Sequence, residues 1–194
     1  SMTVSGTATG VPEVSVSSSE SGAVADGGTD AQGNDPAGTA KTVTYTVSNT
    51  GTDDLTLATA TSSSLTNVTV NAISAPAATT VTPGNLTTFT VQYTPTLAGA
   101  FSFDLAFTNN DGDENPYSMT VSGTATGVPE VSVSSSESGA VADGGTDAQG
   151  NEPAGSAKTV TYTVNNTGTD DLTLATATSS ALTNVTVNSI SAPG

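Results

Sequence analysis

Apolar and polar residues alternate along several stretches of this chain. In the stretch TVTYTV at 42–47, valine and tyrosine alternate with threonine, and large apolar residues repeat with the same period at 89–93, 101–107 and 117–121. A two-residue period places one row of side chains on each face of a strand, and β-branched threonine suits the outer row. We therefore expect strands with one buried and one solvent-exposed face.

Residues that form turns separate these stretches. They are NTGTDD at 49–54, TPG at 82–84, TPTLAG at 94–99 and NNDGDENP at 109–116. We expect seven to nine short strands, at about 13–17, 22–26, 40–49, 54–61, 66–73, 86–94, 100–108 and 115–124. This number and spacing predict an all-β fold, an immunoglobulin-like antiparallel β-sandwich.

The chain also repeats itself at an offset of 117 residues, so that residues 1–77 match residues 118–194. The six differences are Asp35 to Glu152, Thr39 to Ser156, Ser48 to Asn165, Ser64 to Ala181, Ala72 to Ser189 and Ala77 to Gly194. A period of this length suits one independently folding domain, and it predicts tandem repeats of 117 residues.

The repeat divides the chain into three parts. We expect residues 1–10 to be the last strand of a preceding repeat, residues 11–127 to form a complete sandwich, and residues 128–194 to be the first half of the next one. Seven of the eight Phe and Tyr rings fall within 11–127. Because large rings supply much of the buried area of a core, we expect 128–194 to be unable to close a stable core alone.

The charge balance restricts the possible partners. Eighteen acidic residues face two lysines, which gives a net charge of −16, so nucleic acid and anionic membranes are improbable partners. No apolar run reaches the length of a membrane span, and we expect no membrane insertion. The chain has no histidine or cysteine, and we expect no enzymatic activity, although Asp111 and Asp113 leave a paired-carboxylate hydrolase formally possible.

Four stretches of the chain carry a family resemblance. PEVSV, YTVSNTGTDDLTL, TTFTVQYTPTLAGAFSFDLAFTNND and DENPYSMTVSGTAT resemble the choice-of-anchor D domain, which is related to the Hydin-type (ASH) immunoglobulin-like domains, over nearly all of residues 13–126. The resemblance implies an immunoglobulin-like domain of very large bacterial surface and secreted proteins, present in many copies in series. It supplies no catalytic residues.

These observations predict a structural role outside the cell. We expect a spacer or fibre-building segment of a giant extracellular adhesin or surface filament. Its partners would be neighbouring repeats of the same chain, or identical chains whose half-units complete each other. The alternative is a module that binds carbohydrate or another surface through an exposed acidic pole.

Acidic loops are the candidate binding sites. In a sandwich of this topology we expect one pole to carry Asp53, Asp54, Asp111, Asp113 and Glu114, and the other to carry Asp26, Asp30 and Asp35, which would face Asp170 and Asp171 of the next repeat. Such a junction is self-repelling unless a hard cation such as Ca²⁺ joins it, and Ca²⁺ at the inter-repeat junctions is the only cofactor we expect. Alternatively, these residues are present because they form turns and keep a long fibre soluble.

Lys41 and Lys158 suggest a second hypothesis. A solitary lysine in a surface immunoglobulin-like domain can form an isopeptide bond with an asparagine beside a catalytic carboxylate. The alternative is that each lysine protects a strand edge from unwanted pairing.

Overall fold

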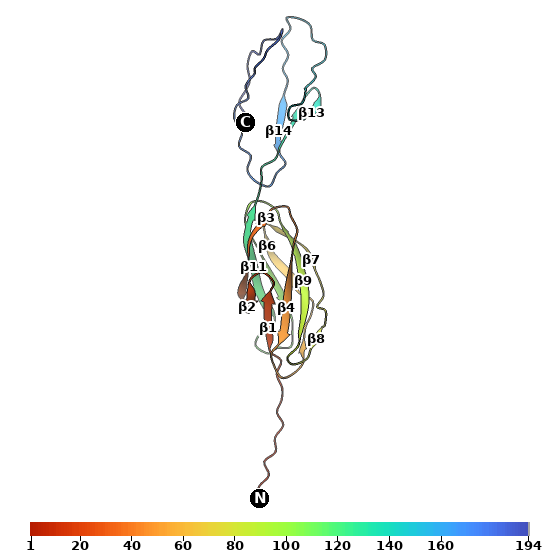
Figure 1. Cartoon of the computed structure of the whole chain (residues 1–194), viewed down its shortest axis with the longest axis vertical. Helices are drawn as coiled ribbons and strands as arrows, with labels where there is room; N and C mark the ends of the chain where they lie inside the picture. Colours follow the sequence, from red (N-terminus) through yellow and green to blue (C-terminus); the bar gives the residue numbers. More distant parts are fainter. Residues whose placement is uncertain (194) are drawn as a thin grey trace. The chain divides into compact units, whose positions relative to one another are not determined.

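The structure is a computed structural model that describes residues 1–193, and the chain divides into two compact units, Ser1–Gly127 and Val128–Gly194 (Figure 1). All regular secondary structure among the described residues is β. Within that part of the chain, no helix of the length and apolarity needed to cross a membrane occurs.

The first unit contains strands β1 to β11, which form two facing sheets and a short extra pair. Their bounds are β1 Val14–Ser18, β2 Gly22–Val24, β3 Gly28–Pro36, β4 Lys41–Asn49, β5 Leu55–Thr56, β6 Thr61–Thr66, β7 Val68–Ile73, β8 Thr80–Val81, β9 Leu86–Pro95, β10 Gly99–Phe107 and β11 Tyr117–Thr126. One sheet has the order β2-β1-β4-β9-β7 and the other β3-β11-β10-β6, while β5 pairs with β8.

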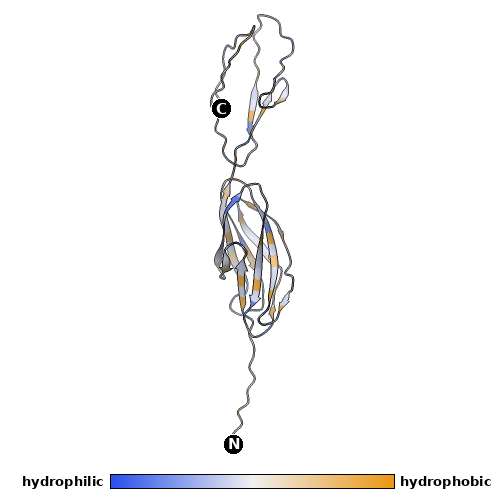
Figure 2. Cartoon of the chain, in the orientation of Figure 1, coloured by the Kyte–Doolittle hydropathy of each residue, from blue (hydrophilic) through white to orange (hydrophobic). Residues whose placement is uncertain are grey.

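The core lies between the two sheets. Buried and more exposed positions alternate along β4, β9 and β10, and Figure 2 shows hydrophobic and more polar positions along the strands. All seven rings of this unit are at most 3% exposed: Tyr45, Phe89, Tyr93, Phe101, Phe103, Phe107 and Tyr117. Several of them pack ring against ring, for example Phe107 with Tyr117 at a centroid distance of 5.4 Å. The predicted all-β sandwich is confirmed, and its interior takes up every ring of the unit.

The strand β3 was not expected, because its sequence GTDAQGNDP has no alternation of apolar residues. We predicted an exposed acidic loop for this region, and that prediction is wrong. The strand pairs in parallel with β11, so the sandwich is not wholly antiparallel. Its inward positions are the polar side chains of Asp30, Gln32 and Asp35, each at most 5% exposed. Their burial depends on partners in the opposite sheet.

The expected strand at 54–61 is also largely wrong, since within it only Leu55–Thr56 and Thr61, the first residue of β6, belong to strands. The chain instead changes sheets between β6 and β7, at Asn67, whose φ is 51°. Asparagine tolerates this left-handed conformation better than most residues do. Its amide donates to the carbonyl of Leu97 at 2.8 Å, which anchors the crossing.

The second unit has three strands, β12 (Val131–Ser135), β13 (Gly139–Val141) and β14 (Tyr162–Asn166), in the order β13-β12-β14. β12 and β13 lie 117 residues after β1 and β2, and β14 corresponds to the second half of β4. Val133 pairs with Val141 just as Val16 pairs with Val24. The sheet therefore forms in the same register, although its apolar side chains remain open to solvent.

Candidate cation site

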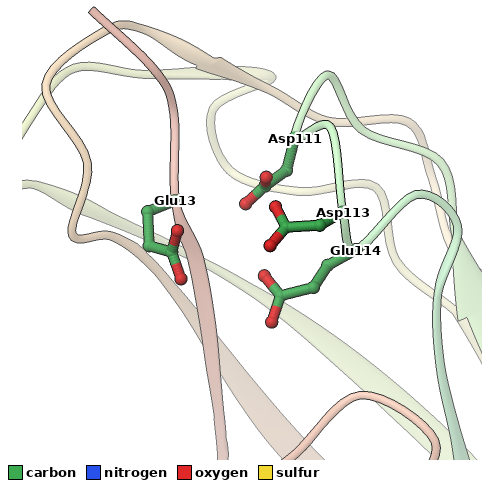
Figure 3. A group of neighbouring side chains, drawn as sticks. All are labelled: Glu13, Asp111, Asp113 and Glu114. Carbon is green, nitrogen blue, oxygen red and sulfur yellow. The ribbon is translucent and has the colours of Figure 1, made fainter.

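Four carboxylates converge at one end of the first unit: Glu13, Asp111, Asp113 and Glu114. One oxygen from each lies within 4.8 Å of the others. Glu13 directly precedes β1, whereas the other three lie on the loop between β10 and β11, and all four side chains face a common space (Figure 3).

The loop holds this arrangement through its own hydrogen bonds. The side chain of Asn109 accepts a bond from the Asp111 N–H at 2.7 Å and donates one to the Glu114 carbonyl at 2.8 Å. The N–H of Val14 donates to Oδ2 of Asp111 at 2.8 Å and so joins the loop to β1. Asp111 is 2% exposed, and its position is fixed by these bonds.

The electrostatics of the four groups differ. Burial, followed by the negative charges of Glu13, Asp111 and Asp113, raises the pKa of Glu114 above its ordinary value. One of its oxygens, Oε2, is buried and has no hydrogen-bond partner. For Asp111 burial opposes ionisation, but hydrogen bonds, first from the Val14 N–H, outweigh it and lower the pKa.

A divalent cation would offset the repulsion between the carboxylates that contributes to the raised pKa of Glu114, and it would give Oε2 of Glu114 a partner. Calcium binds six to eight oxygen ligands at about 2.3–2.6 Å, and carboxylates are its usual protein ligands. Four converging carboxylates and a buried oxygen with no donor fit a hard cation. The residues do not suit zinc, which prefers His and Cys ligands, and the chain has neither.

Sequence reasoning found only part of this cluster. Asp111, Asp113 and Glu114 were expected at one pole together with Asp53 and Asp54, and the structure does not bring the last two into the cluster. Asp53 and Asp54 are exposed, and their backbone carbonyls accept hydrogen bonds from the side chains of Asn49 and Asn110. Glu13 was missed, because its approach to the loop depends on the packing of β1.

At the other pole the expected aspartates accept hydrogen bonds from other residues of the first unit. Asp26 is exposed, and its Oδ1 accepts the Ser118 N–H at 2.7 Å. Asp30 and Asp35 are buried, and each accepts a hydrogen bond from a tyrosine hydroxyl of the opposite sheet: Tyr45 to Asp30 at 2.6 Å and Tyr93 to Asp35 at 2.7 Å.

The corresponding residues expected on the next repeat belong to the second unit. Asp170 and Asp171 are exposed there, and the Asp171 N–H donates to Oδ1 of Asp170 at 2.9 Å. The carbonyl of Asp170 accepts a bond from the Asn166 side chain at 2.7 Å. A cation shared between these aspartates and those of the first unit remains a prediction, and two of the latter, Asp30 and Asp35, already have hydrogen-bond partners.

Lys41 lies between two carboxylates. Its Nζ is 2.9 Å from Oδ1 of Asp35 and 2.9 Å from Oε2 of Glu20, and it also donates to the Gln32 carbonyl at 3.2 Å. Partial burial opposes the charge of this amine, but bonds to Asp35 and Glu20 outweigh it and raise its pKa. The neighbour is thus an aspartate rather than the expected asparagine, and the arrangement favours an ion pair.

Lys158 repeats this arrangement in the second unit. It pairs with Glu152, and with Glu137 at 3.0 Å, and the bonds to these two carboxylates raise its pKa. Glu152 stands where the first unit has Asp35, so the longer side chain keeps the same partner. The isopeptide hypothesis for both lysines remains a prediction.

Comparison with known proteins agrees with this fold. Residues 32–124 match the family model described as HYDIN/CFA65/VesB-like, Ig-like domain, so the first unit is similar to Hydin-type immunoglobulin-like domains. A search of curated proteins finds no match.

Among solved structures, a protein of unknown function from Porphyromonas gingivalis W83 is 17% identical, with a TM-score of 0.42, covering 59% of this chain and 46% of that one. The secreted serine protease VesC from Vibrio cholerae is 14% identical, with a TM-score of 0.40, covering 49% and 21% respectively. The ASH/PapD-like domain of human CEP192 is 11% identical, with a TM-score of 0.37, covering 57% and 84%. The chain therefore spans less than half the length of the first two structures.

Proposed function

We propose that this chain is a structural segment of a giant extracellular adhesin or surface filament, in which immunoglobulin-like sandwiches in series act as a spacer. The observation that carries the proposal is the repetition of the sequence after 117 residues, together with the hydrogen bonds of one of its turns. In the first unit the Asn49 side chain donates to the Asp53 carbonyl at 2.7 Å and accepts the Gly51 N–H at 3.0 Å. Asn166 makes the same two bonds in the second unit, at 2.7 and 3.0 Å.

The composition supports the same role. Each complete repeat encloses its own core, and a net charge of −16 with only two basic residues keeps a long array soluble. Because each sandwich is a separate cooperative unit, an array of them extends under load by unfolding one unit at a time.

Force spectroscopy on several copies of residues 11–127 in series tests the proposal. Each unfolding event is expected to release one repeat, about 400 Å of extended chain before the folded length is subtracted. Regular peaks with this spacing support a load-bearing array. Gradual extension without peaks would contradict it. Binding of an antibody against residues 11–127 to intact source cells tests the extracellular location separately, and binding only after lysis would refute it.

The alternative, a carbohydrate-binding module, has less support. Sugar-binding surfaces commonly use exposed rings, and every ring of the first unit is at most 3% exposed. The acidic end with Asp111 and Asp113 offers carboxylates only. Titration with oligosaccharides, followed by tyrosine fluorescence, is expected to give no change, and saturable binding would favour this alternative.

We further propose that the cluster of Glu13, Asp111, Asp113 and Glu114 binds Ca²⁺ and thereby ties β1 to the loop before β11. The specific observation in favour is the buried, unpartnered Oε2 of Glu114 within the cluster. This location differs from the inter-repeat junction expected from the sequence, since all four ligands belong to the first unit.

Thermal unfolding in calcium and in chelator tests this site. Ligand binding to the folded state at 100 times Kd stabilises it by about 2.7 kcal/mol, which raises the midpoint by several degrees. Asp113→Asn is expected to remove this gain, whereas Asp54→Asn, which removes the same charge outside the cluster, is expected to keep it. Superimposable melts of the native chain in calcium and in chelator would rule the site out.

A further inference from the structure

The chain enters the first unit through an entry segment, residues 11–13, which lies against a turn at residues 49–53, the clamp turn. A Cβ atom at Gly51 would overlap the carbonyl oxygen of Val11 and lie 2.5 Å from the backbone nitrogen of Glu13. Both contacts are with backbone, which cannot move aside as the end of a flexible side chain can. Glycine at this position therefore permits the close approach of the two segments.

Hydrogen bonds join the entry segment to the clamp turn. The N–H of Thr50 donates to the Glu13 carbonyl at 2.8 Å, and the N–H of Thr52 donates to the Val11 carbonyl at 2.7 Å. In the other direction, the Val11 N–H donates to Oγ1 of Thr52 at 3.2 Å. Thr50 and Thr52 are both exposed, so these contacts bury little apolar surface. Their effect on the unit therefore comes mainly from the bonds themselves.

Asn49 connects the clamp turn to the interior of the sandwich. This residue is 1% exposed, and its Nδ2 donates to the carbonyls of Val81 at 2.8 Å and Asp53 at 2.7 Å. Its Oδ1 accepts the Gly51 N–H at 3.0 Å. A pull on the entry segment is thus transmitted to buried residues rather than to a free loop.

The chain enters and leaves the first unit at opposite ends. Val14, the first residue of β1, is bonded to Asp111 in the loop before β11, so β1 and β11 begin at the same end. The ten residues of β11 end at Thr126, about 30 Å further along. Tension along the chain therefore pulls the two strands lengthwise in opposite directions. Because ladder hydrogen bonds are perpendicular to antiparallel strands, this tension loads them in shear, and they break together.

The same contacts recur where the chain enters the second unit. A Cβ atom at Gly168 would overlap the carbonyl oxygen of Val128. The N–H of Thr169 donates to that carbonyl at 2.9 Å, and the N–H of Thr167 donates to the Glu130 carbonyl at 2.7 Å. The contact between entry segment and clamp turn is therefore a feature of the repeat and not of one unit.

We propose that the clamp turn is the mechanical fastening of each repeat. Its bonds to the entry segment lie first on the path of the force, and they must break before β1 can slide along β4. They therefore set the force at which a unit opens. This inference deepens the proposed spacer function and rests on it, because it identifies the contacts that resist tension in the array.

Optical-tweezers measurements on the full chain test the proposal through the point of attachment. The native chain has no cysteine, so a pair of introduced cysteines defines where the force acts. Thr7→Cys with Thr126→Cys loads the first unit through the entry segment. Ser15→Cys with Thr126→Cys applies force within β1 and bypasses the clamp turn. In chelator, which excludes any effect of bound cation, we expect unfolding at a given force to be about tenfold slower with the first pair.

Gly51→Ala separates the clamp turn from general stability. With attachment at Thr7, the variant is expected to unfold about tenfold faster than the native chain, because the added methyl group forces the two segments apart. With attachment at Ser15, we expect no change. Gly112→Ala is the matched control, since a Cβ there has nothing within 4 Å, and it is expected to leave both rates unchanged.

Hydrogen exchange verifies that Gly51→Ala still folds. The amides of Thr50 and Thr52 are expected to exchange about tenfold faster in the variant, whereas amides in the ladder between β4 and β9 keep their protection. If that ladder also opens, Thr52→Val replaces Gly51→Ala, because it removes only the hydroxyl that accepts the Val11 N–H. It is expected to speed unfolding from Thr7 about twofold, again with no change from Ser15.

Equal unfolding rates of the native chain from the two attachment points overturn the proposal. An equal effect of the variant from both points, whether Gly51→Ala or Thr52→Val, overturns it as well. Neither result alters the spacing of unfolding peaks expected for repeats in series. Failure of the clamp turn is therefore distinguishable from failure of the spacer role, which an array that extends without peaks would show.

Discussion

The hydroxyl of Tyr45 donates to Oδ2 of Asp30 at 2.6 Å, and both residues are fully buried between the two sheets. The counterpart bond from Tyr162 to Asp147 has nearly the same length, 2.7 Å, yet Tyr162 is 52% exposed. The bond therefore forms from local chain geometry. Its surroundings depend on strands from the second half of the repeat.

This pair of contacts gives a matched test of burial. Tyr45→Phe leaves the Asp30 carboxylate with the Ser21 hydroxyl as its remaining side-chain donor, at 2.6 Å. A buried charged group that loses a donor costs about 3 kcal/mol in unfolding free energy. Tyr162→Phe is expected to change stability by less than about 0.5 kcal/mol, because water replaces the donor at an exposed site. Urea unfolding followed by circular dichroism measures both, and equal effects would contradict the assignment.

Gly123 gives a second matched test. A Cβ at this position would lie 2.7 Å from the Phe101 ring and 2.9 Å from the Gly33 carbonyl oxygen. Gly123→Ala is therefore expected to destabilise the first unit by about 1–3 kcal/mol, the usual cost of overpacking. Gly6→Ala places the same change in the identical segment, where nothing lies within 4 Å, and is expected to leave the unfolding of this unit unchanged. If Gly123→Ala leaves the free energy of unfolding unchanged, the Phe101 ring must shift to make room for the added methyl group.

The four-carboxylate cluster predicts a pH dependence in the presence of chelator. Because the pKa of Glu114 is raised in the folded state, its contribution to stability is full below the ordinary glutamate pKa and is lost as the pH rises through the folded value. Glu114→Gln removes the repulsion and is expected to stabilise the unit at pH 7 by on the order of 1 kcal/mol. The difference should vanish below about pH 4, where the glutamate is protonated.

Melting curves from pH 3 to pH 8 measure this effect, with Asp53→Asn as the control for net charge outside the cluster. If the difference in melting temperature between the native chain and Glu114→Gln stays the same across that range, the neighbouring carboxylates do not destabilise the ionised Glu114.

The ion pair at Lys41 predicts that the chain remains free of cross-links. Amide formation needs a neutral amine, and the partners of Lys41 raise its pKa, which keeps the amine protonated. The intact mass is therefore expected to equal the sequence mass. An isopeptide bond between lysine and asparagine would instead release one ammonia, a loss of about 17 Da, and that result would support the isopeptide hypothesis. A loss of about 18 Da, one water, would indicate a bond between Lys41 and Asp35 in place of the ion pair.

Much of the fold could be predicted because alternation identifies strands with one buried face. The strands at 40–49, 86–94 and 100–108 agree closely with β4, β9 and β10. The same criterion failed for β3, whose buried positions are Asp30, Gln32 and Asp35. Polar residues are buried there because tyrosine hydroxyls from the facing sheet satisfy them, and no local pattern reveals a partner that lies across the core.

The candidate cation site was predicted in part for a related reason. Asp111, Asp113 and Glu114 are close in sequence, so a loop with clustered carboxylates was visible as a motif. Glu13 is nearly 100 residues away and joins them through the bond between the Val14 N–H and Asp111. Asp53 and Asp54 were equally plausible cation ligands from the sequence, but their side chains are not part of the cluster. Their backbone carbonyls accept hydrogen bonds from Asn49 and Asn110 instead.

The sequence by itself determined the strand periodicity, the 117-residue repeat and the acidic character, because these depend on the order of residues alone. Only the tertiary structure decided which polar side chains are buried and which carboxylates meet. The clearest case is β3, whose sequence has no apolar alternation, although Asp30 and Asp35 are buried because tyrosine hydroxyls of the opposite sheet donate hydrogen bonds to them. Burial of these carboxylates requires donors that lie across the core, and no local residue pattern specifies whether such donors are present.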